Sequence, residues 1–328
     1  SNGVVLITTK RGQEGRATVS YNGYYGWQTV SKKIDMLNAY EYADLVNDAR
    51  NNTYTDKMES INRKLIAQNK NPLSFDISDS NAIRLQNTSN DYNTIVPVEI
   101  LPYLRGEKGL VDTDWQDEIF QTGFITNNNI SITGASAKHS FYLGAGYAYE
   151  QGNIKKEKYS KVTLNVSNDY KVTDNFKVGF QFNGARMLPA DTKSVATALR
   201  AAPVAHVFNE EYGLYTTLPG FQKAQMNNPM VDVELKANTT KAENYRASGN
   251  VYGEWDFLKH FQFKVVYSMD YSSNSTRKYT PIIKVFDNSV EGKVETLGDG
   301  KTGVSQEKQT ETKVQQCENR FFTRKVCV

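Results

Sequence analysis

Between His139 and Arg186 the sequence contains three segments in which apolar and polar residues alternate strictly. The last of them places four apolar side chains at every second position, namely Phe176, Val178, Phe180 and Phe182. Successive side chains of a β-strand point to opposite faces of a sheet, so each segment predicts a strand with one apolar and one polar face. Four further segments alternate in the same way. The seven predicted strands are 17–27, 129–133, 139–150, 161–170, 176–187, 245–256 and 261–271.

The length of these segments separates two kinds of β protein. Strands of soluble sandwiches are usually about five or six residues long, whereas tilted membrane-spanning strands need about 9–11 residues. Most of the predicted strands match the second class. Aromatic residues that we expect near strand ends, where a membrane interface would lie, are Tyr147, Tyr149, Tyr170, Phe176 and Phe182. The pattern favours a transmembrane β-barrel.

The connecting segments alternate between short and long. Short connectors fall at 134–138, 171–175 and 258–260, and longer ones at 28–126, 151–159, 188–244 and after 272. Outer-membrane barrels have short periplasmic turns and long extracellular loops, so we expect the long connectors on one end. Within 28–126 we predict helices over 36–50, capped by Asp35, and around 58–66, and a short helix capped by Asp114, with a loop over 71–93.

Composition removes several function classes. The formal net charge of +3 gives no reason to expect nucleic acid as a partner. The two cysteines, Cys317 and Cys327, lack the spacing of a metal or redox motif. The three histidines are far apart, and residues 298–302 resemble a phosphate-binding loop that has Glu295 where that motif requires glycine. No nucleophile–base pair is evident, so we expect no enzyme, no catalytic or metal site and no cofactor.

The two ends of the sequence differ from the alternating region. Val4 to Thr9 is a continuous apolar and β-branched run, typical of a strand covered on both faces. Because it begins so close to Ser1, we expect that the N-terminus was cut from a longer chain. Residues 316–328 resemble none of the preceding strands and are interpreted as an aberrant tail.

Several motifs, in order, resemble one protein family. The first is the run Asn2, Gly3, Val4, Val5, Leu6, Ile7, Thr8, Thr9, Lys10, Arg11, Gly12, which resembles the end of the plug domain in SusC/RagA-type TonB-linked outer-membrane proteins. The segments that resemble later landmarks of that family are 38–43, 114–120, 131–134, 142–147, 151–152, 202–203, 212–213 and 228–229. The resemblance covers roughly residues 1 to 285.

This resemblance implies an all-β fold in which a plug fills a barrel of about 22 strands. Residues 1–13 would be the end of the plug domain and 14–328 the first part of the barrel, about seven strands, with 28–126 and 188–244 as extracellular loops. The family implies import of glycans or peptides across the bacterial outer membrane. A SusD-like lipoprotein would cover the mouth, and TonB would act through a region missing from this sequence. We therefore expect a truncated fragment, embedded in outer-membrane lipid, that transports nothing alone.

Three aromatic residues in the 188–244 loop are candidate contacts for the imported molecule or for the lipoprotein: Tyr212, Tyr215 and Phe221. The alternative that they pack within the loop is equally open. Two other functions are also open, a passive channel or adhesin barrel and a soluble glycan-binding sandwich. The sandwich predicts a second apolar sheet covering Phe141, Phe180 and Phe263.

Overall fold

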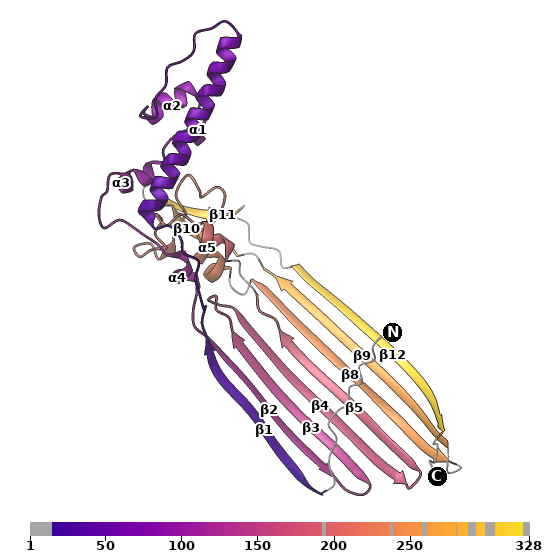
Figure 1. Cartoon of the computed structure of the whole chain (residues 1–328). Coiled ribbons are helices and arrows are strands. Elements are labelled where there is room, and N and C mark those ends of the chain that lie inside the picture. Colours follow the sequence, from indigo (N-terminus) through magenta and orange to yellow (C-terminus); the bar gives the residue numbers. More distant parts are fainter. Residues whose placement is uncertain are drawn as a thin grey trace.

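A computed structural model describes residues 15–191, 195–236, 239–257, 261–279, 281–287, 293–298 and 306–323. Its main feature is an eight-stranded antiparallel sheet in which strands that follow one another along the sequence lie side by side (Figure 1). In sheet order the strands are β1 Gly15–Gln28, β2 Gly123–Ala135, β3 His139–Gln151, β4 Lys158–Thr173, β5 Phe176–Leu188, β8 Thr240–Phe257, β9 Phe261–Lys278 and β12 Gln306–Thr323. Within the described residues β1 and β12 are the two edges and do not pair, so the sheet is open.

All seven predicted strands form, and the sheet has an eighth. The prediction of about seven strands was therefore one short. The missing strand, β12, pairs with β9 along its whole length and includes residues 316–323 of the predicted tail. Its alternation is weak because polar residues replace apolar ones on one face, where Lys313, Gln315 and Asn319 lie opposite Tyr271, Met269 and Val265. Backbone pairing does not require the alternation on which the prediction depended.

Register between the strands gives the sheet two different faces. On one face, residues that lie opposite one another across the strands are apolar, as in the row Leu143, Val166, Phe182 and Met269. On the other face, the adjacent row is polar and consists of Asn165, Asn183, Ser248 and Asp270. We call these the apolar face and the polar face. Side chains of the apolar face remain accessible: Val19 is 63% exposed, Phe182 38% and Tyr267 43%.

Aromatic side chains concentrate at the two ends of the apolar face. At the end of the sheet with the short turns, the distances between ring centroids are 5.1 Å for Trp255–Phe257, 5.8 Å for Phe257–Phe261 and 4.6 Å for Phe263–Phe321. At the other end, they are 6.1 Å for both Tyr25–Trp27 and Trp27–Phe124. Phe182 is an exception to the prediction, because it lies in the middle of β5, opposite Val166 and Gly249. On β9 the apolar band runs from Phe261 to Tyr271. At about 3.3 Å per residue and a tilt of about 40°, it spans about 25 Å, the height of the apolar band on membrane barrels.

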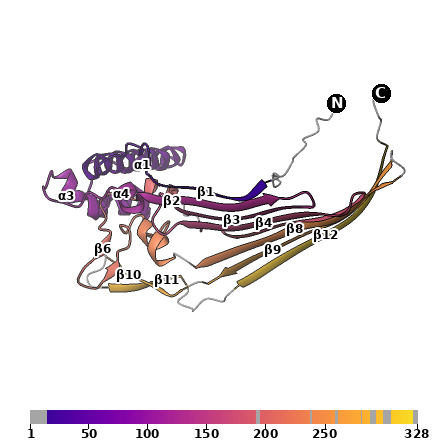
Figure 2. The same cartoon turned by 90° about the horizontal axis from the view of Figure 1, so that it is seen from below.

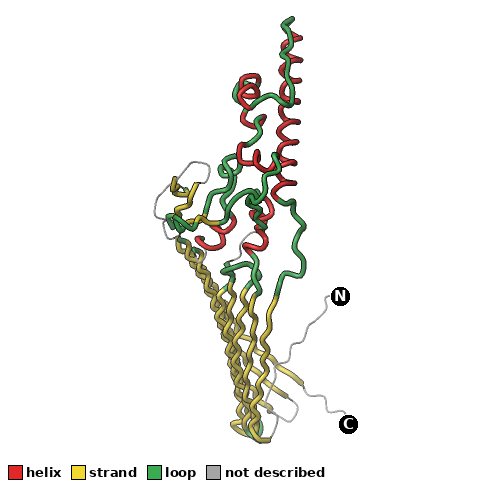
Figure 3. The backbone as a smooth tube through the Cα atoms, turned by 90° about the vertical axis from the view of Figure 1, so that its left-hand side faces the viewer, coloured by secondary structure: helices red, strands yellow, loops and turns green. Residues whose placement is uncertain are grey.

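All the long connectors gather at one end of the sheet, as predicted (Figure 1). Figure 3 shows the helices collected there, with α1 projecting away from the strands. The elements in these connectors are α1 Ala39–Ala67, α2 Asn81–Asn87, η1 Tyr92–Thr94, η2 Val98–Ile100, α3 Leu101–Leu104, α4 Trp115–Ile119, α5 Ala196–Arg200, β6 Phe208–Asn209, β7 Leu214–Tyr215, η3 Val231–Leu235, β10 Ile283–Asp287 and β11 Lys293–Leu297. We call this the connector end and the opposite one the turn end.

Helix α1 corrects the helix prediction. It begins after Asn38, not Asp35, because Asn38 and Glu41 form a reciprocal capping box with three hydrogen bonds of 3.0 Å. It then continues through 51–57, where two separate helices were expected, and buries Tyr54 and Met58. Helix α2 lies in the stretch predicted to be a loop, and α4 begins after Asp114 as predicted. None of the helices in the described part of the chain is long and apolar enough to cross a membrane.

The buried hydrophobic clusters lie in the connectors. Two of them centre on Trp115 with Ile119 and on Ala39 with Ile100, and a third joins Val231 to β10. Figure 2 shows the large sheet as a single curved layer. The remaining sheets that the structure describes have two strands each, at the connector end. No second sheet in the described residues covers Phe141, Phe180 and Phe263, which contradicts the sandwich alternative.

Candidate functional site

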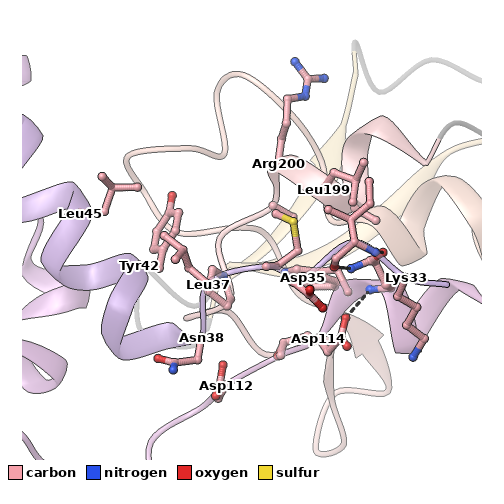
Figure 4. A pocket seen from close by; sticks show the side chains of 18 residues that line it. Lys33, Asp35, Leu37, Asn38, Tyr42, Leu45, Asp112, Asp114, Leu199 and Arg200 are labelled. Carbon is pink, nitrogen blue, oxygen red and sulfur yellow. Dashed lines mark hydrogen bonds between the residues drawn. The ribbon is translucent and has the colours of Figure 1, made fainter.

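A cavity of about 550 Å³ lies at the connector end, between two connectors that are far apart in sequence. Three segments line it: 33–38 with Tyr42 and Leu45 of α1, 112–116 before and within α4, and residues from α5 to Pro203. In Figure 4, Tyr42 and Leu45 reach into the view from α1, and Leu199 lies on the opposite side. The cavity is therefore a junction between the β1–β2 and β5–β8 connectors.

Hydrogen bonds fix the first connector around the cavity. Gln116 binds the backbone of Ile34 twice, with Nε2 donating to the carbonyl at 2.6 Å and Oε1 accepting from the amide at 3.0 Å. Asp112 Oδ1 accepts from the Ala39 amide at 2.9 Å, at the positive end of α1. An ion pair between Lys33 and Asp117 closes the same region. The lining of the cavity is thus held in one arrangement.

The second connector is attached through Trp115 and Thr113. Trp115 Nε1 donates to the Ala202 carbonyl at 3.0 Å from a ring that is only 3% exposed. The Thr113 amide donates to the Pro203 carbonyl at 2.9 Å, and its hydroxyl donates to the Ala205 carbonyl at 2.7 Å. These bonds make the two connectors one packed unit.

The cavity supports binding chemistry. Aliphatic side chains at its mouth, Ile34, Met36, Leu37 and Leu45, are each 45–57% exposed. Burial raises the pKa of Tyr42, so its hydroxyl stays protonated and can donate a hydrogen bond. No group of three or more potential metal ligands occurs among the described residues. The arrangement suits contact with a ligand or a partner surface.

The three residues predicted as contacts lie elsewhere in the connectors. Tyr212 is 44% exposed and stacks on Phe286 at 4.7 Å. Tyr215 packs edge-on against Phe208 at 5.1 Å, and Phe221 packs on the cluster around Ala39. None of the three lines the cavity. No local pattern in the sequence marks the cavity, because the segments that line it meet only through contacts between distant residues.

The polar face of the sheet carries a compact cluster near the turn end. Tyr252 and Asp169 are 7% and 9% exposed, and the Tyr252 hydroxyl donates a hydrogen bond to Asp169. The Tyr252 ring crosses Gly179, where a Cβ would lie 2.7 Å from it. The Nζ atoms of Lys264 and Lys177 lie 4.3 and 5.6 Å from the centroid of the ring. This cluster joins β4, β5, β8 and β9.

The predicted plug signature, Asn2 to Gly12, and the apolar run from Val4 to Thr9 lie outside the described residues, as do 324–328 of the predicted tail.

Comparison with known proteins relates this fold to one family. No model of a known protein family matches the sequence. TonB-dependent receptor P3 of Formosa agariphila is 24% identical over 293 residues, which is 86% of this chain and 24% of that receptor. TonB-dependent receptor SusC of Bacteroides thetaiotaomicron is 24% identical over 284 residues, 80% of this chain and 23% of that receptor.

Solved structures agree with these relatives. The RagAB peptide importer in its "closed-closed" state aligns with a TM-score of 0.54 at 16% identity, over 95% of this chain and 41% of the other. A structure of the RagAB peptide transporter aligns with a TM-score of 0.55 at 15% identity and the same coverage. The chain is a distant homologue of the SusC/RagA-type TonB-dependent receptors.

This homology confirms three predictions. The resemblance was correctly identified, and TonB-dependent receptors are transporters, not enzymes, that reside in the bacterial outer membrane. The chain spans about a quarter of the length of the curated relatives it matches. The eight-stranded sheet of this chain aligns with part of the RagA structure.

Proposed function

We propose that this chain forms part of the barrel wall and the extracellular loops of an importer that takes up glycans or peptides across the outer membrane. The observation that carries the proposal is the sheet itself. It has one apolar face with an aromatic row at each end and one polar face, and its long connectors share one end. A wall between lipid and a water-filled interior requires this arrangement. The apolar face then contacts lipid, and the connector end is extracellular.

The proposed partners follow from the relatives. The solved relatives are complexes named RagAB, a peptide importer, which supports a SusD-like lipoprotein over the connector end. TonB would act on the plug from the turn end, using inner-membrane energy. The RagAB name supports peptides as cargo, and glycans are proposed from the resemblance of the sequence motifs to the family.

Energy dependence tests this proposal against the passive channel. Uptake by cells that carry the complete receptor should stop when an uncoupler dissipates the proton-motive force or when TonB is deleted. A passive channel would continue to equilibrate solute under both treatments. Uptake that is unaffected by either treatment would refute the importer proposal.

We propose further that this chain alone transports nothing. An open sheet of eight strands encloses no lumen, and its two edges leave backbone groups that hydrocarbon cannot satisfy. Plugged outer-membrane transporters use about 22 strands. Planar-bilayer recordings of the purified chain should show no discrete conductance steps, whereas reproducible steps would contradict the proposal.

Contacts with cargo or with the lipoprotein are proposed at two places in the connectors. One is the cavity mouth around Met36 and Leu37, and the other is Tyr212, the most exposed of the three predicted aromatic residues. In the complete receptor, Met36→Glu and Tyr212→Ala should each reduce uptake without lowering the amount in the membrane. The matched control is Ile66→Glu on the distal part of α1, an equally exposed apolar position. An equal loss of uptake in the control would remove the assignment.

A further inference from the structure

The polar face of the sheet carries a region without unpaired charge. Three successive rows pass through Tyr142, Gly144 and Gly146 on β3 and continue across all eight strands. Most side chains in these rows end in an amide or a hydroxyl. The two charged ones, Arg246 and Asp270, pair with each other at 3.0 Å. We call these three rows the neutral wall.

A cavity of about 260 Å³ lies in the neutral wall, between side chains of β5, β8, β9 and β12. Asn183, Ser248, Asn250 and Ser268 line it. Their four side chains make no hydrogen bond with any residue that the structure describes. Amides and hydroxyls both donate and accept hydrogen bonds, so these groups are available to a bound molecule from either side of the bond.

Tyr142 adds an aromatic surface to the same wall. Its ring lies across the buried Gly144, where a Cβ would be 2.6 Å from the hydroxyl oxygen and 2.9 Å from Cε1. The ring therefore lies along the strand, and the surface that it leaves accessible faces away from the sheet. Among the described residues the Tyr142 hydroxyl has no hydrogen-bond partner, and neither have the neighbouring side chains of Asn165 and Ser167.

Tyr142 and the cavity belong to one row and are close enough for a single cargo molecule to contact both. The row runs from Tyr142 through Ser167 and Gln181 to Asn250, one residue on each successive strand. Adjacent strands lie about 4.8 Å apart, so Tyr142 and Asn250 are separated by about 14 Å. That separation suits an extended molecule of several rings.

We propose that the neutral wall binds an uncharged oligosaccharide, with one sugar ring on Tyr142 and another in the cavity at Asn250. Sugar hydroxyls donate and accept hydrogen bonds, as the groups of the wall do. The C–H groups on one face of a sugar ring pack on the electron-rich face of an aromatic ring. A peptide carries charged termini, which this wall would desolvate without an opposite charge. The inference rests on the proposed function, because the polar face lines a water-filled interior only in the assembled importer.

The test measures retention of labelled molecules by the complete receptor, purified in detergent and immobilised. The probes are a mixture of neutral oligosaccharides from partially hydrolysed plant, algal and yeast polysaccharides and, separately, a tryptic peptide mixture. The unaltered receptor should retain the oligosaccharides and not the peptides. Tyr142→Leu should weaken that retention about tenfold, the size of one lost aromatic contact. Tyr142→Phe keeps the ring and should keep most of the retention.

Tyr147→Leu is the matched control, because Tyr147 lies on the same strand but on the apolar face. Ser248→Leu fills the cavity without touching Tyr142 and should also weaken retention. Heat-modifiable migration checks that each variant is assembled. Equal retention by Tyr142→Leu and the unaltered receptor, or retention of the peptides in place of the sugars, would overturn the inference. Uptake by cells that continues in the presence of an uncoupler would instead refute the proposed importer.

Discussion

Arg84 should hold the distal part of the connector against α1, and removing it should release that part alone. Its side chain is 2% exposed and donates to four acceptors that lie in three segments of the connector. Nε reaches the Asp79 carbonyl at 3.1 Å, Nη1 the Thr94 carbonyl at 2.9 Å, and Nη2 both Asn51 Oδ1 at 2.6 Å and the Ile77 carbonyl. The guanidinium also lies 4.9 Å from the Tyr54 ring centroid.

The variant Arg84→Met keeps much of the volume but supplies no donor. Each buried acceptor left without a partner costs about 1–3 kcal/mol, and partial relaxation brings the expected total to about 3–5 kcal/mol. Local opening of residues 77–96 would then become about two to nearly four orders of magnitude more frequent, since 1.36 kcal/mol corresponds to a factor of ten. The strands of the sheet share no hydrogen bond with this segment and should be unaffected.

Amide hydrogen exchange measures this directly. Reporter amides are those of Thr88, bonded to the Arg84 carbonyl at 3.0 Å, and Val96, bonded to Asn81 Oδ1 at 3.0 Å. Both should exchange at or near the unprotected rate in Arg84→Met, while amides of β3 and β4 keep their protection. Arg63→Met on the exposed side of α1 is the control and should change neither set. Retained protection at Thr88 and Val96 in the Arg84 variant would show that Arg84 does not hold this segment.

Two further predictions concern the sheet and the β10–β11 hairpin. Gly179→Ala should displace the Tyr252 ring and destabilise the assembled sheet by about 1–3 kcal/mol, measured by thermal melting. The control Gly26→Ala, whose new Cβ would have its nearest neighbour atom 3.7 Å away, should have little effect. Equal melting of the two variants would contradict a stabilising role for the Tyr252–Asp169 cluster. The hydrogen bond from Lys223 to the fully buried Asp287 raises the pKa of Lys223 above its ordinary 10.5. A raised pKa means that the pair stabilises the hairpin fully below about 10.5 and loses this effect as the pH rises through the raised value. Protease protection of residues 283–287 and 293–297 should therefore persist at neutral pH and fall in alkali, and a Lys223→Met variant should lack that protection at all pH values. A protected variant would contradict the assignment.

The strands were predictable from the sequence because their signal is local. Alternation from Phe176 to Phe182 or from Phe261 to Tyr271 depends only on neighbours along the chain, and each pattern became a strand with the expected face. The one-sided placement of the long connectors followed from strand order alone. Strand β12 was missed because Lys313, Gln315 and Asn319 remove the alternation while the backbone still pairs with β9.

Features of the connectors depended on contacts that the sequence does not show. Gln116 binds Ile34 across 82 positions, and Trp115 binds the Ala202 carbonyl across 87. The cavity between these segments therefore has no local signature. Helix α1 continues past Asn51 because residues outside the helix bind its polar side chains. Arg84 donates a hydrogen bond to Asn51, and Asp79 accepts one from the Tyr54 hydroxyl. Tyr212, Tyr215 and Phe221 were chosen as candidate contacts only because they are aromatic residues in a loop. Their packing partners in the connectors could not be seen in the sequence.

A single charge tests whether the apolar face of the sheet contacts lipid. Val265→Arg places a cation near the middle of the apolar band on β9, at a cost of about 2–4 kcal/mol in hydrocarbon. Ser268→Arg places the same charge on the polar face of the same strand, opposite Asn250. Heat-modifiable migration of the complete receptor from outer-membrane fractions should show loss of the assembled form for Val265→Arg and normal assembly for Ser268→Arg. Normal assembly of both variants, or loss of Ser268→Arg alone, would contradict the account.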